Sequence, residues 1–263
     1  MRLKLVPPQR GMVWVRDGLR VFFRKPLAFC LLLVVYLLIG PMLMLAVAPL
    51  ASLGFMIATR QALQDRFPFP GVFIEPLQAS RSQRWAQIQL GIAYAIAVGL
   101  LFWLGDAIGG TAFDALRKAV GEGRTTPQDL EPLLGDPSLQ TAWMLLAVGM
   151  AVIAVPFWHA PALVHWAGQG AAKSLFFSTV ACWRNKGALT LFVLGWAAVT
   201  LLLLMLTVTV FALLGMPQLV FVAATPLSLM VSAAFYASIY FSFADSFEPS
   251  GAQQIASTTQ EAP

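Results

Sequence analysis

The fold is decided by one uncharged run near the C-terminus, residues 187–244, which reads GALTLFVLGWAAVTLLLLMLTVTVFALLGMPQLVFVAATPLSLMVSAAFYASIYFSFA. It contains no Asp, Glu, Lys or Arg, and Gly215, Met216 and Pro217 stand near its middle. A membrane-spanning helix needs about 20 apolar residues, and Gly and Pro favour turns. The run therefore predicts a hairpin of two membrane helices.

Working outward from this hairpin, three further stretches lack charged residues: 26–59, 85–105 and 139–172. The first is too long for one crossing and contains Gly40 and Pro41, which predict a reversal between two helices. One long kinked helix is the alternative. The sequence thus predicts an all-α polytopic membrane protein with about six transmembrane helices, at about 26–39, 42–60, 86–105, 140–160, 187–213 and 218–244.

The composition excludes a water-soluble protein. Hydrophobic residues make up 59% of the chain, charged residues 11%, and the mean hydropathy is +0.75. Soluble domains carry roughly 25% charged residues. The net charge of +5 is therefore interpreted by its distribution along the chain, and no nucleic-acid partner is predicted. Cys30 and Cys182 form no CxxC pair and indicate no disulfide framework.

Basic residues are distributed unevenly around the predicted spans. With the N-terminus in the cytoplasm, the inside segments carry Arg2, Lys4, Arg10, Arg16, Arg20, Arg24, Lys25, Arg60, Arg66, Arg81, Arg84, Lys173, Arg184 and Lys186. The outside carries only Arg117, Lys118 and Arg124. Because cytoplasmic loops hold an excess of Lys and Arg, the sequence predicts that both termini are cytoplasmic.

The remaining segments complete a single-domain organisation. Residues 1–245 are predicted to form one transmembrane helical domain, whose outside loop covers about 106–139. Within that loop, Phe113, Leu116 and Val120 have helical spacing and predict a short surface helix. The tail at 246–263 is small and polar, which predicts disorder.

An internal repeat is a further hypothesis. Similar segments with an aromatic residue and a base stand before or at the start of three spans, at 23–27, 83–86 and 182–186. The second helix of each unit contains a proline, namely Pro49, Pro156 or Pro226. The pattern predicts three helical-hairpin units. The alternative is that membrane helices resemble one another by composition alone.

The basic segment before the first span is the clearest local feature. Arg16, Arg20 and Arg24 recur every four residues and share one helical face, followed by Lys25. A second face is apolar, so we predict an amphipathic helix at the cytoplasmic interface. These four basic residues are candidate contacts for an anionic lipid or an acidic partner. A simple topology anchor is the alternative.

Two other segments favour packing or docking roles. Gly91, Ala95 and Gly99 form a small-residue stripe at a spacing of four, which lets helices approach closely. The stripe predicts either internal packing or a dimer seam. The proline-rich segment 67–76 is predicted either to fold against the membrane face or to dock a partner.

No catalytic or cofactor-binding pattern is found in the sequence. His159 and His165 are six residues apart and would lie on different helix faces, so interfacial positions are predicted and no metal site is expected. The segment 168–174 resembles a phosphate loop, but Ala167 and Ala172 occupy the glycine positions. We therefore expect no cofactor and no enzymatic activity.

The chain resembles an uncharacterised family of proteobacterial multi-pass inner-membrane proteins. The resemblance rests on short segments: Val6-Pro7, Arg10-Gly11, Trp14-Val15, Gly18, Phe22, Pro49, Ser52-Leu53-Gly54-Phe55, Ala160-Pro161-Ala162-Leu163 and Trp183-Arg184-Asn185. It implies a location in the bacterial inner membrane and a helix count. It implies no activity and no functional residues.

Two functional hypotheses follow from these features. The first is a non-enzymatic membrane scaffold that contacts lipids or an unidentified partner protein, because the spans are uncharged and the interface is basic. The alternative is a carrier or channel for a neutral or lipidic solute, because Thr207, Ser228 and Ser232 place hydroxyl groups in the last two spans.

Overall fold

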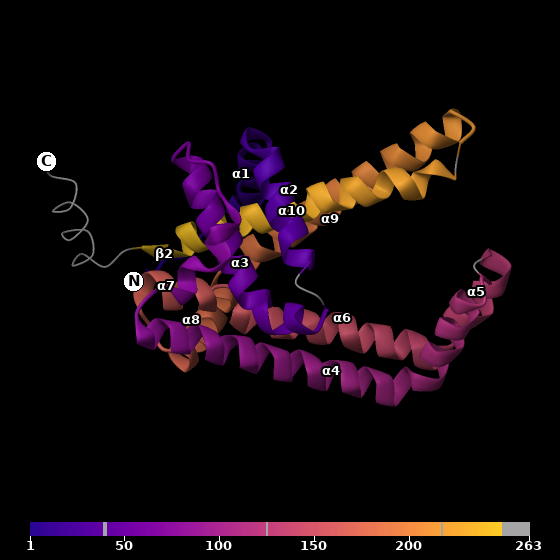
Figure 1. The fold of residues 1–263 in the computed structure, drawn as a ribbon, viewed down its shortest axis with the longest axis horizontal. Coiled ribbons are helices and arrows are strands. Elements are labelled where there is room, and N and C mark those ends of the chain that lie inside the picture. Colours follow the sequence, from indigo (N-terminus) through magenta and orange to yellow (C-terminus); the bar gives the residue numbers. More distant parts are fainter. Residues whose placement is uncertain (39–40, 125, 217, 249–263) are drawn as a thin grey trace, which may run out of the picture.

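The computed structural model describes the chain except residues 39–40, 125, 217 and 249–263. It is almost entirely helical (Figure 1). Its elements are β1 (Arg2–Leu3), α1 (Arg10–Arg24), α2 (Pro26–Leu38), α3 (Pro41–Leu63), η1 (Pro70–Phe73), η2 (Glu75–Leu77), α4 (Arg81–Gly121), α5 (Pro127–Leu134), α6 (Pro137–Phe157), α7 (Ala160–Ala167), α8 (Ala171–Arg184), α9 (Lys186–Leu213), α10 (Leu219–Ser246) and β2 (Phe247–Glu248).

The all-α polytopic membrane fold is confirmed. Within the described residues, five helices are long and apolar enough to cross a membrane, and a sixth is counted if the bent pair α1 and α2 is one span. The predicted first span, 26–39, is a separate helix of only 13 residues. Such a helix is about 20 Å long, shorter than the hydrocarbon layer of about 30 Å. It reaches span length only together with α1, across a bend of 98°.

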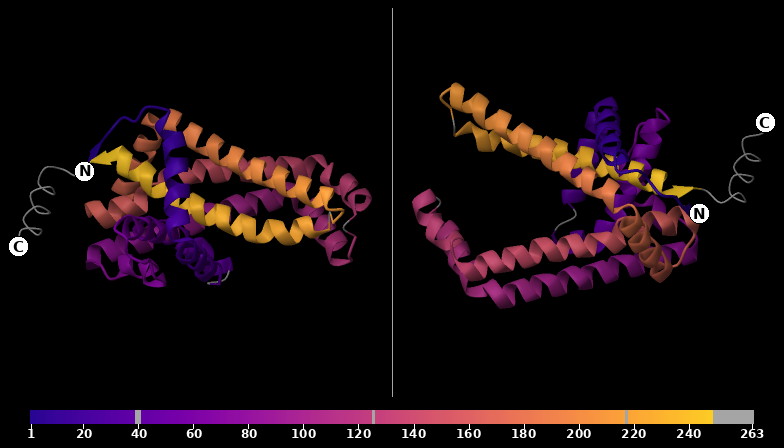
Figure 2. Two further views of the ribbon diagram at one scale, coloured as in Figure 1. Left: turned by 90° about the horizontal axis from the view of Figure 1, so that it is seen from above. Right: turned by 180° about the vertical axis from the view of Figure 1, so that it is seen from behind.

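Two long helical hairpins dominate the shape. Helix α4 packs against α6, and α9 packs against α10. Both hairpins extend in the same direction from the end that carries β1 and β2, and they diverge along the way (Figures 1 and 2). Helices α1, α2, α3, α7 and α8 lie at that end together with the start of α9 and the last turns of α10, and this region is here called the platform. Helix α3 joins the two hairpins because it packs against both α4 and α10.

Helix α4 is longer than the sequence predicted. It runs through 41 residues, about 60 Å. The helical conformation predicted at Phe113, Leu116 and Val120 is confirmed, but these residues continue α4 and do not form a short helix of their own. Close packing explains the continuation. A Cβ atom at Gly109 would lie 2.8 Å from the Cβ atom of Ala142 on α6, so α4 follows its partner beyond Asp106.

The platform has an aromatic core. Trp14, Phe22, Phe29, Phe55 and Phe192 are among its largest fully buried side chains. They come from α1, α2, α3 and α9, so segments far apart in the sequence meet here. In a bilayer, lipid chains are as apolar as these side chains, so close packing stabilises the platform more than the removal of water does.

The two ends of the chain pair beside the platform. Strands β1 and β2 are antiparallel, with Arg2 opposite Glu248 and Leu3 opposite Phe247. Asn185, which is buried, accepts a hydrogen bond from the Val6 N–H and donates to the Lys4 carbonyl oxygen and the Ser246 Oγ. The Glu248 carboxylate, which also bonds the Lys4 ammonium at 2.9 Å, raises the pKa of that lysine.

This pairing changes the predicted boundary of the C-terminal tail. Disorder was predicted from 246, but Phe247 and Glu248 form β2, and Phe247 is buried against the platform. A polar composition did not reveal the backbone pairing, because the partner strand lies at the other end of the chain. The rest of the predicted tail, 249–263, falls outside the described residues.

The proposed repeat is uneven in the structure. Pro49 and Pro226 lie inside α3 and α10, each in the first half of the helix. Pro156, in contrast, is the next-to-last residue of α6. The first and third units are therefore alike in the placement of their prolines, and the second unit differs from them.

Candidate functional site

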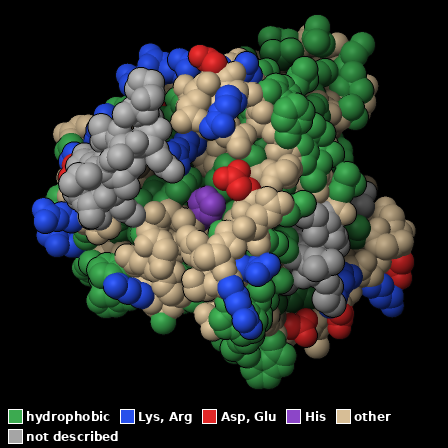
Figure 3. Space-filling view, turned by 60° about the vertical axis from the view of Figure 1, so that its left-hand side comes forward, with side chains coloured by type: hydrophobic (Ala, Val, Ile, Leu, Met, Phe, Trp, Pro, Cys, Tyr) green, Lys and Arg blue, Asp and Glu red, His purple; other side chains and the backbone are tan. Residues whose placement is uncertain are grey.

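The candidate site is the basic end of the molecule, where strands β1 and β2 and the platform lie. Lys and Arg side chains are spread over this end, with few acidic groups among them (Figure 3). They belong to α1, the end of α3, the start of α4, and α8 with its flanking residues. Two parts of this end combine basic and apolar side chains, the outer face of α1 and the first turns of α4.

Helix α1 has two distinct faces. Its inner face buries Trp14, Val15 and Phe22 against α9 and α10, which α1 crosses (Figure 2). The approach is close, because a Cβ atom at Gly11 would lie 2.1 Å from the Ala188 carbonyl oxygen. A Cβ atom at Gly18 would lie 2.2 Å from the Cβ atom of Ser238. The amphipathic helix that the sequence predicted is present, and much of its apolar face packs on protein.

The outer face of α1 carries the predicted basic residues. Arg16, Arg20 and Arg24 are exposed beside the exposed side chains of Met12 and Phe23. Together with Val15 and Leu19, these residues line a shallow groove of about 570 Å³. Asp17 lies 3.1 Å from the Arg16 guanidinium and 3.7 Å from that of Arg20, so it offsets part of the positive charge. Lys25 is half-buried at the C-terminal cap of α1.

An acidic residue that sequence reasoning missed holds α1 in place. The Asp245 carboxylate accepts hydrogen bonds from the Arg10 guanidinium at 2.8 Å and from the Trp14 indole N–H at 2.7 Å. It thereby links the start of α1 to the end of α10. One signal in the sequence was available, since Asp245 is the first charged residue after the uncharged run 187–244.

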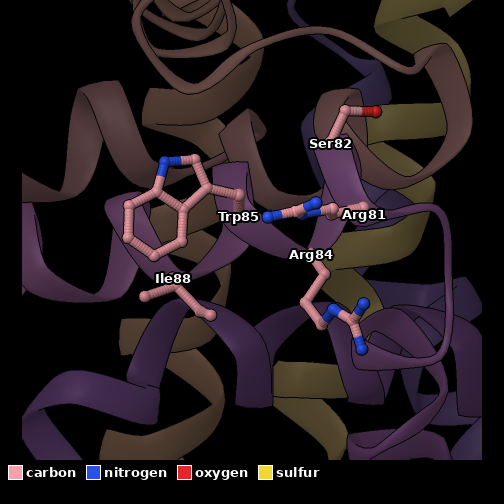
Figure 4. A pocket seen from close by; sticks show the side chains of 5 residues that line it. All are labelled: Arg81, Ser82, Arg84, Trp85 and Ile88. Atoms are coloured by element: carbon pink, nitrogen blue, oxygen red, sulfur yellow. The ribbon is translucent and has the colours of Figure 1, made fainter.

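The first turns of α4 form a second basic and apolar surface (Figure 4). Arg81, Ser82, Arg84, Trp85 and Ile88 line an open hollow of about 800 Å³. In Figure 4, Arg81 reaches toward Trp85, Ile88 lies beside Trp85, and Arg84 turns away from both. Among the described residues, no ion pair involves Arg81 or Arg84. Sequence reasoning used these two arginines only for orientation, although two bases flanking a Trp at the start of an apolar run indicated this surface.

Both surfaces have the chemistry of phospholipid headgroup sites. A guanidinium group binds phosphate through paired N–H donors, and Trp favours the boundary between headgroups and hydrocarbon. Beyond Trp85, the exposed side chains of Ile92, Ile96 and Leu100 continue along α4, where an acyl chain would lie. Each base near an anionic membrane surface contributes about 1 kcal/mol.

Comparison with known proteins places the chain in a family. It is 32% identical to a probable inner membrane protein of Burkholderia thailandensis, over 278 aligned positions that cover 98% of this chain and 99% of the relative. This chain belongs to that inner-membrane protein family. No family model matches it, and no solved structure matches it. The resemblance seen in the sequence is thereby confirmed.

In this inner-membrane protein, the three residues of the small-residue stripe, Gly91, Ala95 and Gly99, have different neighbours. A Cβ atom at Gly91 would lie 2.4 Å from the Ala46 carbonyl oxygen, so this glycine marks the close contact of α4 with α3. Ala95 is half-buried. Gly99 is exposed, with no neighbouring atom within 4 Å of the Cβ position. The structure therefore does not bring the three residues into one contact.

The two histidines have different environments. His159 is fully buried, and its ring lies 5.9 Å from that of Phe243 and 5.5 Å from that of Phe247. His165 is half-buried, with Nε2 3.8 Å from a Glu75 carboxylate oxygen. Within the described residues, no group of three or more His, Cys, Asp and Glu side chains has an arrangement that would hold a metal ion.

The proline-rich segment after α3 folds back as η1 and η2. Val72 and Pro76 are buried, and the Phe73 ring lies 5.8 Å from the Phe55 ring. Phe67 and Phe69 remain exposed. Part of the segment thus packs on α3 and α4, and its exposed phenylalanines add apolar surface to the basic end.

Proposed function

We propose that this inner-membrane protein is a non-enzymatic scaffold whose basic end faces the cytoplasm and binds anionic phospholipid headgroups. The observation that carries the proposal is the outer face of α1. Packing on α9 and α10 holds the helix, so Arg16, Arg20 and Arg24 are presented together with Met12 and Phe23. The three guanidinium groups suit lipid phosphates, and the two apolar side chains suit the acyl chains next to them.

The position of α1 along α9 supports a location at the membrane boundary. Helix α9 has 28 residues and is about 42 Å long, which exceeds the hydrocarbon thickness by roughly 12 Å. The contacts of Gly11 with Ala188 and Phe192, and of Met12 with Gly195, lie in the first turns of α9. Helix α1 therefore crosses α9 near the depth of the headgroups.

The distribution of charge supports the orientation. Strands β1 and β2 pair at the basic end. Arg117, Lys118 and Arg124 lie on α4 and just beyond it, at the other end of that helix. Since basic residues favour the cytoplasmic side, the basic end and both termini are assigned to the cytoplasm.

The test is phospholipid binding by the full-length protein. Delipidated protein in a neutral detergent is titrated with phosphatidylglycerol or phosphatidylcholine, and bound lipid is counted by native mass spectrometry. Changing Arg16, Arg20 and Arg24 to Gln removes about 1 kcal/mol per residue, so affinity for phosphatidylglycerol falls by on the order of 100-fold. The matched control changes Arg117, Lys118 and Arg124 to Gln.

Two results would overturn the lipid-binding proposal. One is an affinity of the α1 variant for phosphatidylglycerol equal to that of the control variant. The other is equal binding of phosphatidylglycerol and phosphatidylcholine by the unchanged protein, because a headgroup site must prefer negative charge.

A second candidate function is the carrier or channel for a neutral or lipidic solute. A hollow of about 280 Å³ between α9 and α10 is lined in part by Thr200, Thr207, Ser228 and Ser232. Thr200, Thr207 and Ser228 donate hydrogen bonds to carbonyl oxygens of their own helices, which is a stable arrangement in lipid without any solute.

The carrier hypothesis is tested by accessibility of the hollow to water. Single cysteines replace Thr207, Ser228 or Ser232 in a protein whose Cys30 and Cys182 are changed to Ala. A water-filled path predicts reaction with a membrane-impermeant thiol reagent at all three positions and none at the exposed Leu202→Cys control. Absence of reaction at all positions would reject the path.

A further inference from the structure

A cavity lies between α3, α4, α6 and α10. Its volume is about 160 Å³, and it is lined by residues of α3, α4, α6 and α10 and by Trp158, which follows α6. The lining residues are Ala48, Pro49, Ser52, Tyr94, Ala154, Phe157, Trp158, Phe235, Tyr236 and Ile239. The cavity thus belongs to both hairpins and to the helix that joins them.

Five aromatic rings form much of the wall. The rings of Tyr94 and Phe157 lie 5.0 Å apart, and those of Phe235 and Tyr236 lie 5.9 Å apart. Trp158 packs edge-on against Phe235 at 6.3 Å. These flat walls favour a flat apolar ligand, because aromatic rings interact best in stacked or edge-to-face arrangements.

Two of the lining residues, Tyr94 and Tyr236, carry phenolic hydroxyl groups. Among the described residues, no hydrogen bond involves the hydroxyl of Tyr94 or of Tyr236. The other polar groups at the wall are satisfied, since Ser52 donates to the Pro49 carbonyl oxygen and the Trp158 indole N–H donates to the Ser242 Oγ. Neither hydroxyl is among the buried side-chain atoms that lack a partner, so each reaches open space and can donate to a ligand that brings acceptor oxygens.

The depth of the cavity restricts the source of those oxygens. Tyr94 lies ten residues beyond Arg84 on the same helix, about 15 Å along its axis. If Arg84 and Trp85 mark the headgroup boundary, Tyr94 lies near the middle of a hydrocarbon layer about 30 Å thick. The ester carbonyls of phospholipids stay at the boundary, so they do not reach the two hydroxyls.

We infer that this cavity binds the ring of a membrane-soluble quinone, with its carbonyl oxygens accepting hydrogen bonds from Tyr94 and Tyr236. The volume fits one six-membered ring, since a protein cavity of about 150 Å³ holds benzene. Such a ligand stays in the bilayer, and its apolar tail leaves between the diverging hairpins. The inference concerns binding alone. It uses Arg84 and Trp85 only to set the depth of the cavity and does not require the basic surfaces to bind lipid headgroups.

The test is a titration of the full-length protein in nanodiscs with decylbenzoquinone. Quenching of the tryptophan fluorescence of the protein measures binding. Quenching is expected to saturate, and Trp158→Phe should remove much of the saturable part. Tyr94→Phe and Tyr236→Phe keep the rings and delete the donors, so each weakens binding by about fivefold. Tyr240→Phe is the matched control, because Tyr240 lies on α10 against Trp166 and does not line the cavity.

A second variant and a competitor complete the test. Ala154→Leu fills the cavity, so saturable quenching should disappear while the melting temperature of the protein remains within a few degrees. Decane, which has no acceptor oxygen, should compete weakly. Non-saturable quenching, unchanged affinity in both tyrosine variants, or equal competition by decane would each overturn the inference, leaving water or any hydrocarbon chain as the occupant.

Discussion

The platform and the far ends of the hairpins are held together in different ways. In the platform, Trp14, Phe55 and Phe192 are fully buried, and glycines let α1 approach α9 and α10 closely. Toward the far end of the α9–α10 hairpin, the exposed fraction is 83% for Leu213 and 81% for Phe221. The difference indicates that close packing fixes the arrangement of the helices in the platform. At the far ends lipid surrounds the side chains, so substitutions there should be tolerated.

The largest effect is expected from adding a methyl group inside the platform. In Gly11→Ala, the new Cβ atom would lie 2.1 Å from the Ala188 carbonyl oxygen and 2.7 Å from the Phe192 backbone nitrogen. Because both neighbours are backbone atoms, α1 must move away from α9, at a cost of about 3 kcal/mol. The free energy of unfolding in mixed micelles measures this cost. A loss below about 0.5 kcal/mol would show that α1 is not held as described.

A smaller loss is expected where the chain ends meet the platform. Asn185→Ala removes bonding partners of the Val6 N–H, the Lys4 carbonyl oxygen and the Ser246 hydroxyl. Leaving such groups unpaired costs about 2 kcal/mol. Hydrogen exchange should accelerate at Val6 and at β1. Unchanged exchange there would contradict the role of Asn185 in holding the two ends together.

The link between α1 and α10 is expected to contribute less. Arg10 and Asp245 are partly exposed, so their coupling energy should be about 1 kcal/mol. A double-mutant cycle with Arg10→Gln and Asp245→Asn isolates this coupling. The expected result is a smaller loss in the double variant than the two single losses predict. Additive losses would show that the pair does not fasten α1.

The smallest effect is expected at the lipid-facing side of α4. In Gly99→Leu, the new side chain enters open space, so the free energy of unfolding should change by less than about 0.5 kcal/mol. The oligomeric size of the protein in detergent is the second measurement. If the variant were much less stable, or if the unchanged protein were a dimer and the variant a monomer, Gly99 would lie in a dimer seam. Either result would weaken the contrast between the platform and the hairpins.

Much of the hairpin architecture was predictable, because its signals are local. The run 187–244 became α9 and α10, which reverse near Gly215 in a left-handed backbone conformation with φ of 69°. The end of α4 was not predictable in the same way. Charged residues after Gly105 suggested a loop, but contacts such as that between Gly109 and Ala142 continue the helix.

The candidate sites likewise include features that a local sequence pattern predicted and features that only contacts between distant residues create. The spacing of Arg16, Arg20 and Arg24 was visible in the sequence because a helix has a fixed period. The partnership of Asp245 with Arg10 and Trp14 joins residues at opposite ends of the chain, and no local pattern encodes it. The quinone cavity likewise combines side chains from separate helices, which only packing brings together.

The sequence by itself determined that this protein is a multi-pass helical membrane protein with a basic end. Those properties follow from composition, run length and charge, which act residue by residue along the chain. Only the tertiary structure decided that α1 is packed against α9 and α10, that strands β1 and β2 pair, and that Tyr94 and Tyr236 line one cavity. These features depend on close contacts between distant segments, where backbone approach and side-chain shape decide the outcome.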